Sequence, residues 1–207
     1  MNLNRVNLNR VNLNRRHFMQ LLALGGANLG FINPSVQAAN ETDLEIVSLA
    51  IVAEQLAVEA YTRAVASKQF TGILGFYFKS ALRQEADHLK ALSKVSKSLG
   101  GTVTDTNFIF EPGVFDSPIE LLRLMNALED AFVGAYLGAL PLIKDKNILS
   151  AAGAILGVEA GHRVILREAR LNFRDPAISG ARVPNDRTYE TALTPAEAVA
   201  ALKPFRR

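Results

Sequence analysis

The sequence has no cysteine and no tryptophan among its 207 residues, and aromatic residues make up only 7% of it. The absence of cysteine excludes disulfide bonds, thiolate metal sites and thiol catalysis. Acidic residues are absent from residues 1–39, which hold four of the 23 basic residues. The remaining 19 basic and 20 acidic residues leave a net charge of −1, so we expect no nucleic-acid partner.

Apolar residues make up 49% of the chain and charged residues 21%, as in an ordinary soluble globular protein. A chain of this length can bury a substantial core in one domain, with a short appendage. These values exclude a disordered chain, so the order of the apolar and polar residues carries structural information.

Residues 1–39 have the pattern of an export signal. A basic start precedes a short apolar stretch, residues 21–32, and small residues follow at positions 36–39. This pattern predicts a signal peptide that is cleaved after Ala38 or Ala39. A membrane span needs about 20 apolar residues, so we expect no stable membrane anchor after cleavage. The alternative is an uncleaved anchor.

Arg15 and Arg16 stand together before the apolar stretch, with Phe18 two positions further on. This arrangement resembles a twin-arginine signal, whereas a generic signal is the alternative. The resemblance implies export of the folded chain to the periplasm or an equivalent compartment, and it favours a cofactor acquired before export.

After residue 40 the apolar residues recur with a helical period. The pattern predicts four helices and a short helix in the tail, over residues 42–67, 71–99, 117–144, 148–172 and 194–204. Capping motifs at Thr42, Ser117 and Thr194 mark three of the starts, and Pro141 predicts a kink.

The first two helices, and likewise the last two, are joined by a few residues, which predicts two antiparallel hairpins. Residues 101–116 join the hairpins, and 16 extended residues reach roughly 50 Å, further than the ~38 Å of a 25-residue helix. The chain is therefore predicted to be an all-α four-helix bundle with one long crossover. We divide it into a signal peptide (1–39), the bundle (40–172) and a tail (173–207).

Each helix has an inward seam, on which apolar residues alternate three and four positions apart, and each seam carries ionisable residues near its middle. These six residues are Glu54, Glu85, His88, Glu129, Glu159 and His162. Tyr61 and Tyr136 lie on the same seams, as does Met125, which we interpret as apolar filling. The polar residues should therefore meet at one depth in the core.

The pattern occurs twice. Glu54 and Tyr61 recur 75 residues later as Glu129 and Tyr136, and Glu85 and His88 recur 74 residues later as Glu159 and His162. These offsets predict two related hairpins about a pseudo-two-fold axis.

Four carboxylates in a dry core repel one another, and burying each charge costs several kcal/mol. No lysine or arginine lies on the seams, so protons or metal ions must compensate the charge. Two divalent ions would neutralise four carboxylates, and oxygen and nitrogen ligands suit iron or manganese, with zinc also accepted. A protonated polar network without metal is the alternative.

This ligand pattern resembles that of the ferritin-like di-metal carboxylate proteins, over residues 42–172. Longer motifs resemble the exported ferritin-like group that includes desiccation-related proteins: Ala127-Leu128-Glu129-Asp130, Ala135-Tyr136-Leu137-Gly138-Ala139, Val158-Glu159-Ala160-Gly161-His162 and Leu193-Thr194-Pro195-Ala196-Glu197. The resemblance implies a ferritin-like four-helix bundle that holds two metal ions.

By the same resemblance, Glu54 and His88 would be terminal ligands of one ion, and Glu129 and His162 of the other. Glu85 and Glu159 would bridge the two ions. Tyr61 and Tyr136 would hydrogen-bond near the terminal carboxylates or act as redox relays, whereas simple core packing is the alternative.

The resemblance implies redox chemistry on peroxide, dioxygen or ferrous iron. A second hypothesis is a non-catalytic envelope stress or desiccation-related protein, and a third is a metal-free helical adaptor. Metal ions are the expected partners, and a homo-oligomer is compatible with the sequence.

Overall fold

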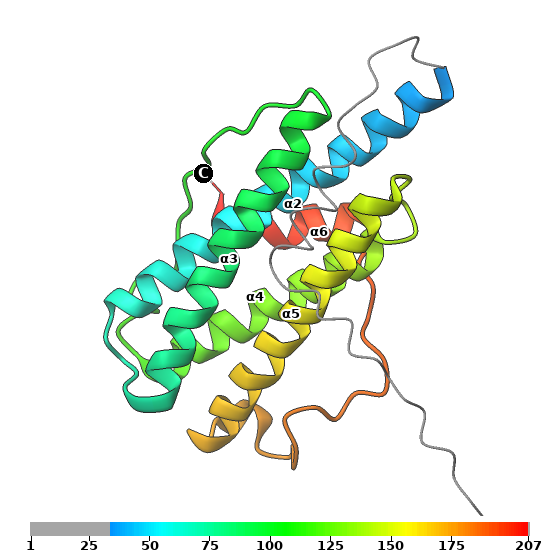
Figure 1. Ribbon diagram of the computed structural model, residues 1–207. Coiled ribbons are helices and arrows are strands. Elements are labelled where there is room, and N and C mark those ends of the chain that lie inside the picture. Colours follow the sequence, from blue (N-terminus) through cyan, green and yellow to red (C-terminus); the bar gives the residue numbers. More distant parts are fainter. Residues whose placement is uncertain (1–33, 207) are drawn as a thin grey trace, which may run out of the picture.

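The computed structural model describes residues 34–206, which form an all-α bundle (Figure 1). Its elements are α2 (Pro34–Ala66), α3 (Gly72–Ser98), α4 (Pro118–Ala139), α5 (Lys146–Asn172), η1 (Pro176–Ile178), α6 (Pro195–Leu202) and η2 (Lys203–Phe205). The predicted signal peptide lies mostly outside the described residues, and its last residues, 34–39, belong to α2.

The four long helices form two hairpins, α2 with α3 and α4 with α5, as the short connections predicted. The hairpins pack together mainly through α2 against α4 and α3 against α5, and α6 lies on α4. The crossover, residues 101–116, runs along the outside of the bundle (Figure 1). Its Phe108 is buried in the core, and the amide of Ile109 donates to the carbonyl of Phe205 over 2.9 Å.

Two predicted helix limits were wrong. The helix predicted to begin at Thr42 begins at Pro34, because no breaker separates these positions and Ala38 and Ala39 favour a helix. The predicted kink at Pro141 is absent, because α4 ends at Ala139, where the proline ring would interfere with a continuing helix.

The remaining helix starts follow from local capping. Ser117 accepts a hydrogen bond from the amide of Glu120, and Thr194 and Glu197 form a complete capping box on α6. Asp145 caps α5, a role that the sequence analysis did not assign to it. Asp43, which is buried on α2, accepts the amides of residues 144 and 145 over 2.8 Å and so ties the α4–α5 turn to α2.

The apolar core is divided into two clusters by the polar residues at mid-height. One cluster, which we call the Tyr61 end, includes Tyr61, Phe78 and Met125. The other, the Tyr136 end, includes Tyr136 and Ala152. Met125 is fully buried among apolar neighbours, as its interpretation as filling requires.

The tail is fixed to α4 and α5 by close backbone packing and by ion pairs. The amide of Leu193 donates to the carbonyl of Gly134 over 2.9 Å, and a Cβ atom at Gly138 would lie only 1.8 Å from the carbonyl oxygen of Leu193. The buried Arg163 pairs with Glu190 over 2.5 Å. Two motifs far apart in the sequence, around Gly138 and Leu193, thus form one contact.

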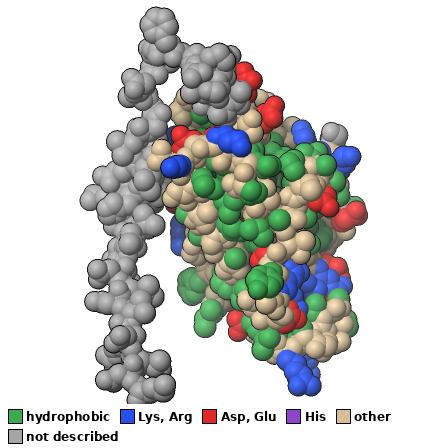
Figure 2. All heavy atoms as spheres, turned by 90° about the vertical axis from the view of Figure 1, so that its right-hand side faces the viewer, with side chains coloured by type: hydrophobic (Ala, Val, Ile, Leu, Met, Phe, Trp, Pro, Cys, Tyr) green, Lys and Arg blue, Asp and Glu red, His purple; other side chains and the backbone are tan. Residues whose placement is uncertain are grey.

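Helix α5 is long and apolar enough to cross a membrane by length and composition. Its inward face, however, carries Glu159 and His162 into the bundle, so we interpret it as a core helix. Its outer face keeps Leu149 and Ile165 partly exposed. Figure 2 shows hydrophobic side chains across the middle of the face that lies on the right of Figure 1.

We predict that Gly138→Ala lowers the free energy of unfolding by roughly 1–3 kcal/mol, because the new methyl group displaces the tail backbone. Thermal unfolding followed by circular dichroism measures the change. The matched control is Gly157→Ala in α5, where nothing lies near the added atom and alanine should stabilise the helix by up to ~1 kcal/mol. Equal stability of the two variants would contradict the close packing.

Candidate metal centre

Four helices each bring a buried carboxylate to the middle of the bundle. Glu85, Glu129 and Glu159 are fully buried and Glu54 is 2% exposed. His162, 3% exposed, and His88, 9% exposed, follow Glu159 and Glu85 by one helical turn, so each imidazole lies on the same helix face as its carboxylate.

The imidazole of His88 faces three carboxylates through Nδ1. This atom lies 3.0 Å from Oε1 of Glu159 and 3.5 Å from Oε2 of both Glu54 and Glu85. The three carboxylates come from α2, α3 and α5, so this half of the cluster forms only when both hairpins are docked.

The imidazole of His162 repeats this arrangement on the other side. Its Nδ1 lies 2.9 Å from Oε1 of Glu85, 3.4 Å from Oε2 of Glu159 and 3.6 Å from Oε1 of Glu129. The contact of His88 with Glu159 therefore has its counterpart in the contact of His162 with Glu85. The internal repeat of the sequence is repeated in the geometry of the cluster.

Two overlapping groups of four residues have ligand atoms within 4.8 Å of one another and could each hold a metal ion. The first is Glu54, Glu85, His88 and Glu159, and the second is Glu85, Glu129, Glu159 and His162. Glu85 and Glu159 belong to both groups, which is the arrangement that bridging ligands require. The structure thus brings together all six residues that the sequence analysis selected.

The electrostatics of the cluster show how strongly it needs positive charge. Burial raises the pKa of Glu54 and of Glu129 well above the usual range, and the neighbouring carboxylates raise both further. Burial would also raise the pKa of Glu159, but the close imidazoles of His162 and His88 lower it to about 2. Burial would lower the pKa of each histidine, yet the close carboxylates raise both values to about 12.

The hydrogen bonding of the cluster favours a metal site over a protonated network. Eight buried ligand-type atoms have no hydrogen-bond partner: Oε2 of Glu54 and Glu129, both carboxylate oxygens of Glu85 and Glu159, and Nδ1 of His88 and His162. A proton on an imidazole Nδ1 can satisfy one or two oxygens, whereas a metal ion accepts four or more ligand atoms at once. The donor set therefore fits two oxygen- and nitrogen-binding divalent ions.

The two tyrosines cross between the hairpins. Tyr61 of α2 donates to Oε1 of Glu129 over 2.6 Å, and Tyr136 of α4 donates to Oε1 of Glu54. Burial raises the pKa of both phenols well above the usual value, so both keep the proton that they donate. The sequence placed each tyrosine near a carboxylate, but it did not show that each one serves the carboxylate of the other hairpin.

Two residues around the cluster were missed by the sequence analysis. The hydroxyl of Tyr77 lies 3.0 Å from that of Tyr61, which gives its own proton to Glu129, and Tyr77 also donates to the carbonyl oxygen of His162 over 3.5 Å. Oε1 of Gln84 lies 2.9 Å from Nε2 of His162 and fixes this ring with Nδ1 toward the carboxylates. Both residues fall outside the seam pattern, so only the tertiary structure reveals them.

The chain matches the ferritin-like domain family over residues 42–172. This match covers more than half of the chain and includes all six residues of the cluster, so the chain belongs to the ferritin-like domain family. A search of curated proteins found no match.

We predict that Gln84→Leu weakens the affinity for a divalent ion by roughly 10–100-fold, because His162 loses the acceptor that orients its ring. Competition with a metal chelator measures this affinity. Gln69→Leu is the matched control, because Gln69 donates to the carbonyl of Phe115 outside the cluster. An unchanged affinity in Gln84→Leu would show that the ring needs no such support.

Proposed function

We propose that this protein is an exported di-metal carboxylate oxidoreductase that carries two iron or manganese ions. One observation carries the proposal: the eight partnerless oxygen and nitrogen atoms that converge between four buried carboxylates and two imidazoles. Ligands of this kind, without sulfur, suit iron and manganese. Export rests on the signal pattern of residues 1–39.

Within this proposal Glu54 and His88 would hold one ion, Glu129 and His162 would hold the other, and Glu85 and Glu159 would be shared between them. Two ferrous ions, when bound, would together supply two electrons, enough to convert one hydrogen peroxide and two protons to two waters, or one dioxygen and two protons to hydrogen peroxide. Peroxide, dioxygen and ferrous iron are therefore the candidate substrates.

The surrounding tyrosines keep the ligands oriented. Tyr61 and Tyr136 donate to Oε1 of Glu129 and of Glu54, which leaves Oε2 of each carboxylate for metal. The Tyr61–Tyr77 pair extends from Glu129 toward the partly exposed Tyr77, so it offers a path for one electron or one proton. We propose the redox relay role for Tyr61 on this basis, and for Tyr136 on its contact with Glu54.

We predict that the natively exported protein contains about two metal ions per chain, and that Glu85→Ala/His88→Ala contains markedly fewer. The variant loses one bridging and one terminal ligand, and elemental analysis of protein purified without chelators measures the loss. Glu59→Ala/Glu168→Ala removes two carboxylates outside the cluster, one half-buried and paired with Arg63 and one exposed, and should retain the metal. Equal metal in the wild type and in the cluster variant would show that these residues are not ligands.

We predict that the chain loaded with ferrous iron under anaerobic conditions oxidises two iron ions per peroxide or per dioxygen added, because the two ions react together. Stopped-flow absorbance of the ferric product measures the stoichiometry, and the cluster variant is the control. No reaction with either oxidant in a protein that retains its metal would favour the non-catalytic envelope stress protein instead.

A further inference from the structure

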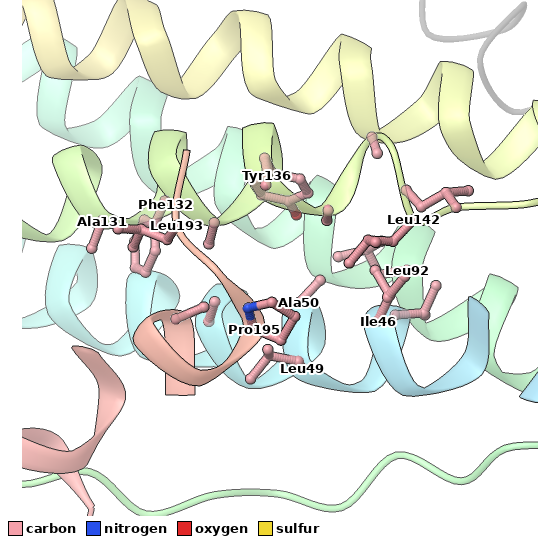
Figure 3. A pocket seen from close by; sticks show the side chains of 18 of the residues that line it. Ile46, Leu49, Ala50, Leu92, Ala131, Phe132, Tyr136, Leu142, Leu193 and Pro195 are labelled. Atoms are coloured by element: carbon pink, nitrogen blue, oxygen red, sulfur yellow. The ribbon is translucent and has the colours of Figure 1, made fainter. Parts of the chain in front are cut away.

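A cavity of about 90 Å³ lies among the four long helices and α6, mainly at the Tyr136 end of the bundle (Figure 3). Aliphatic and aromatic residues, alanines and one glycine form its wall, and Tyr136 is the one lining residue with a polar side chain. Figure 3 shows Phe132 and Tyr136 of α4 on one side, and Ile46 and Ala50 of α2 on the other.

The cavity exists because the two halves of the bundle differ at equivalent positions. At the Tyr61 end, the hydroxyl of Tyr77 contacts that of Tyr61, and Phe78 and Met125 fill the core. The offsets of 74 and 75 residues place alanine at each equivalent position of the Tyr136 end, namely Ala151, Ala152 and Ala50. All three alanines line the cavity.

The cavity reaches from the protein surface to Tyr136, which contacts the candidate metal cluster. At its outer rim Leu142 is 37% exposed, and Pro195 of the tail is also exposed. At its inner limit Tyr136 is buried, and the hydroxyl of this tyrosine donates to Glu54 in the cluster. A small molecule that enters between α4 and the tail would therefore stop against the side chain that touches a ligand residue.

The apolar wall of the cavity favours dioxygen over the other candidate substrates. A ferrous ion would lose its hydration with no ligand in return. Hydrogen peroxide would find among the lining side chains only one partner, the acceptor oxygen of Tyr136, because the Tyr136 proton is already donated to Glu54, so its other hydrogen-bonding groups would stay unpaired. Dioxygen needs no hydrogen bonds. An apolar cavity of about 150 Å³ stays dry and accepts benzene or xenon, so one of about 90 Å³ suits a diatomic gas or xenon rather than a long chain.

We propose that this cavity is the entry route and holding site for dioxygen at the metal centre. This inference rests on the proposed function and narrows its substrate to dioxygen. Of the two pseudo-symmetric ends, the Tyr136 end admits the gas, whereas aromatic side chains fill the Tyr61 end. Tyr136 forms the partition between the gas and the ligand Glu54.

Xenon gas is the probe for the cavity, because it is apolar and binds without any metal. We expect crystals of the full chain under xenon pressure to show xenon beside Tyr136, and Ala50→Met and Ala152→Phe to abolish that site. These variants place in the cavity the side chains that the chain itself uses at the Tyr61 end. Ala154→Met on the exposed face of α5 is the matched control and should keep the xenon.

The same variants separate dioxygen from peroxide in the iron-loaded protein. We expect Ala50→Met to slow oxidation by dioxygen about tenfold, because entry now requires a conformational change, and to leave oxidation by peroxide unchanged. Equal rates with dioxygen in Ala50→Met and wild type, equal slowing by both oxidants, or displacement of xenon by decanoate at micromolar concentration would each overturn the route.

Metal analysis of the same samples distinguishes the two proposals. A chain that retains its metal and excludes xenon overturns the dioxygen route alone. A chain that admits xenon and binds no metal overturns the proposed function, and with it the destination of the route.

Discussion

The repulsion among four carboxylates at one depth of the bundle is the constraint on which the rest of this structure depends. A helical bundle normally fills its centre with apolar side chains, but here each helix interrupts its apolar seam at mid-height. The interruption can persist only if protons or cations compensate the charge of the carboxylates. The two apolar clusters on either side supply the packing that keeps the carboxylates close, so the bundle holds in place a cluster that would otherwise separate.

The internal repeat accounts for most of the contacts in the cluster, and one position breaks the symmetry. The contacts of His88 with Glu159 and of His162 with Glu85 are equivalent, as are the contacts of the two tyrosines with the opposite hairpin. The symmetry fails at Gln84, because Val158 stands at the equivalent position and cannot accept a hydrogen bond from His88. The two halves of the cluster are therefore chemically different, although their ligands are of the same kind.

The periodicity of the sequence was sufficient to predict α3 and α5 to within two residues, the crossover, the bundle and the meeting of six polar side chains. The periodicity was insufficient at the helix ends, where a capping motif or a proline gives a local signal that the rest of the helix can override. Thr42 has the pattern of a cap but lies inside α2, and Pro141 follows the end of α4 instead of bending it. Three features depend on contacts between helices, which the period of a single helix does not specify. They are the hydrogen bonds of Tyr61 and Tyr136 to the opposite hairpin, the contact of Gln84 with His162, and the cavity.

The division of the cluster between the two hairpins also has a kinetic consequence. The first group of candidate ligands draws on α2, α3 and α5, and the second on α3, α4 and α5, so no single hairpin contains either group. We expect an ion held there to leave slowly, because freeing it from all of its ligands would require α2–α3 to move away from α4–α5 against the packing of both apolar clusters. The lifetime of a bound ion would then depend on the rate at which the two hairpins separate. A protein that has bound its metal could pass through a metal-poor environment without losing it.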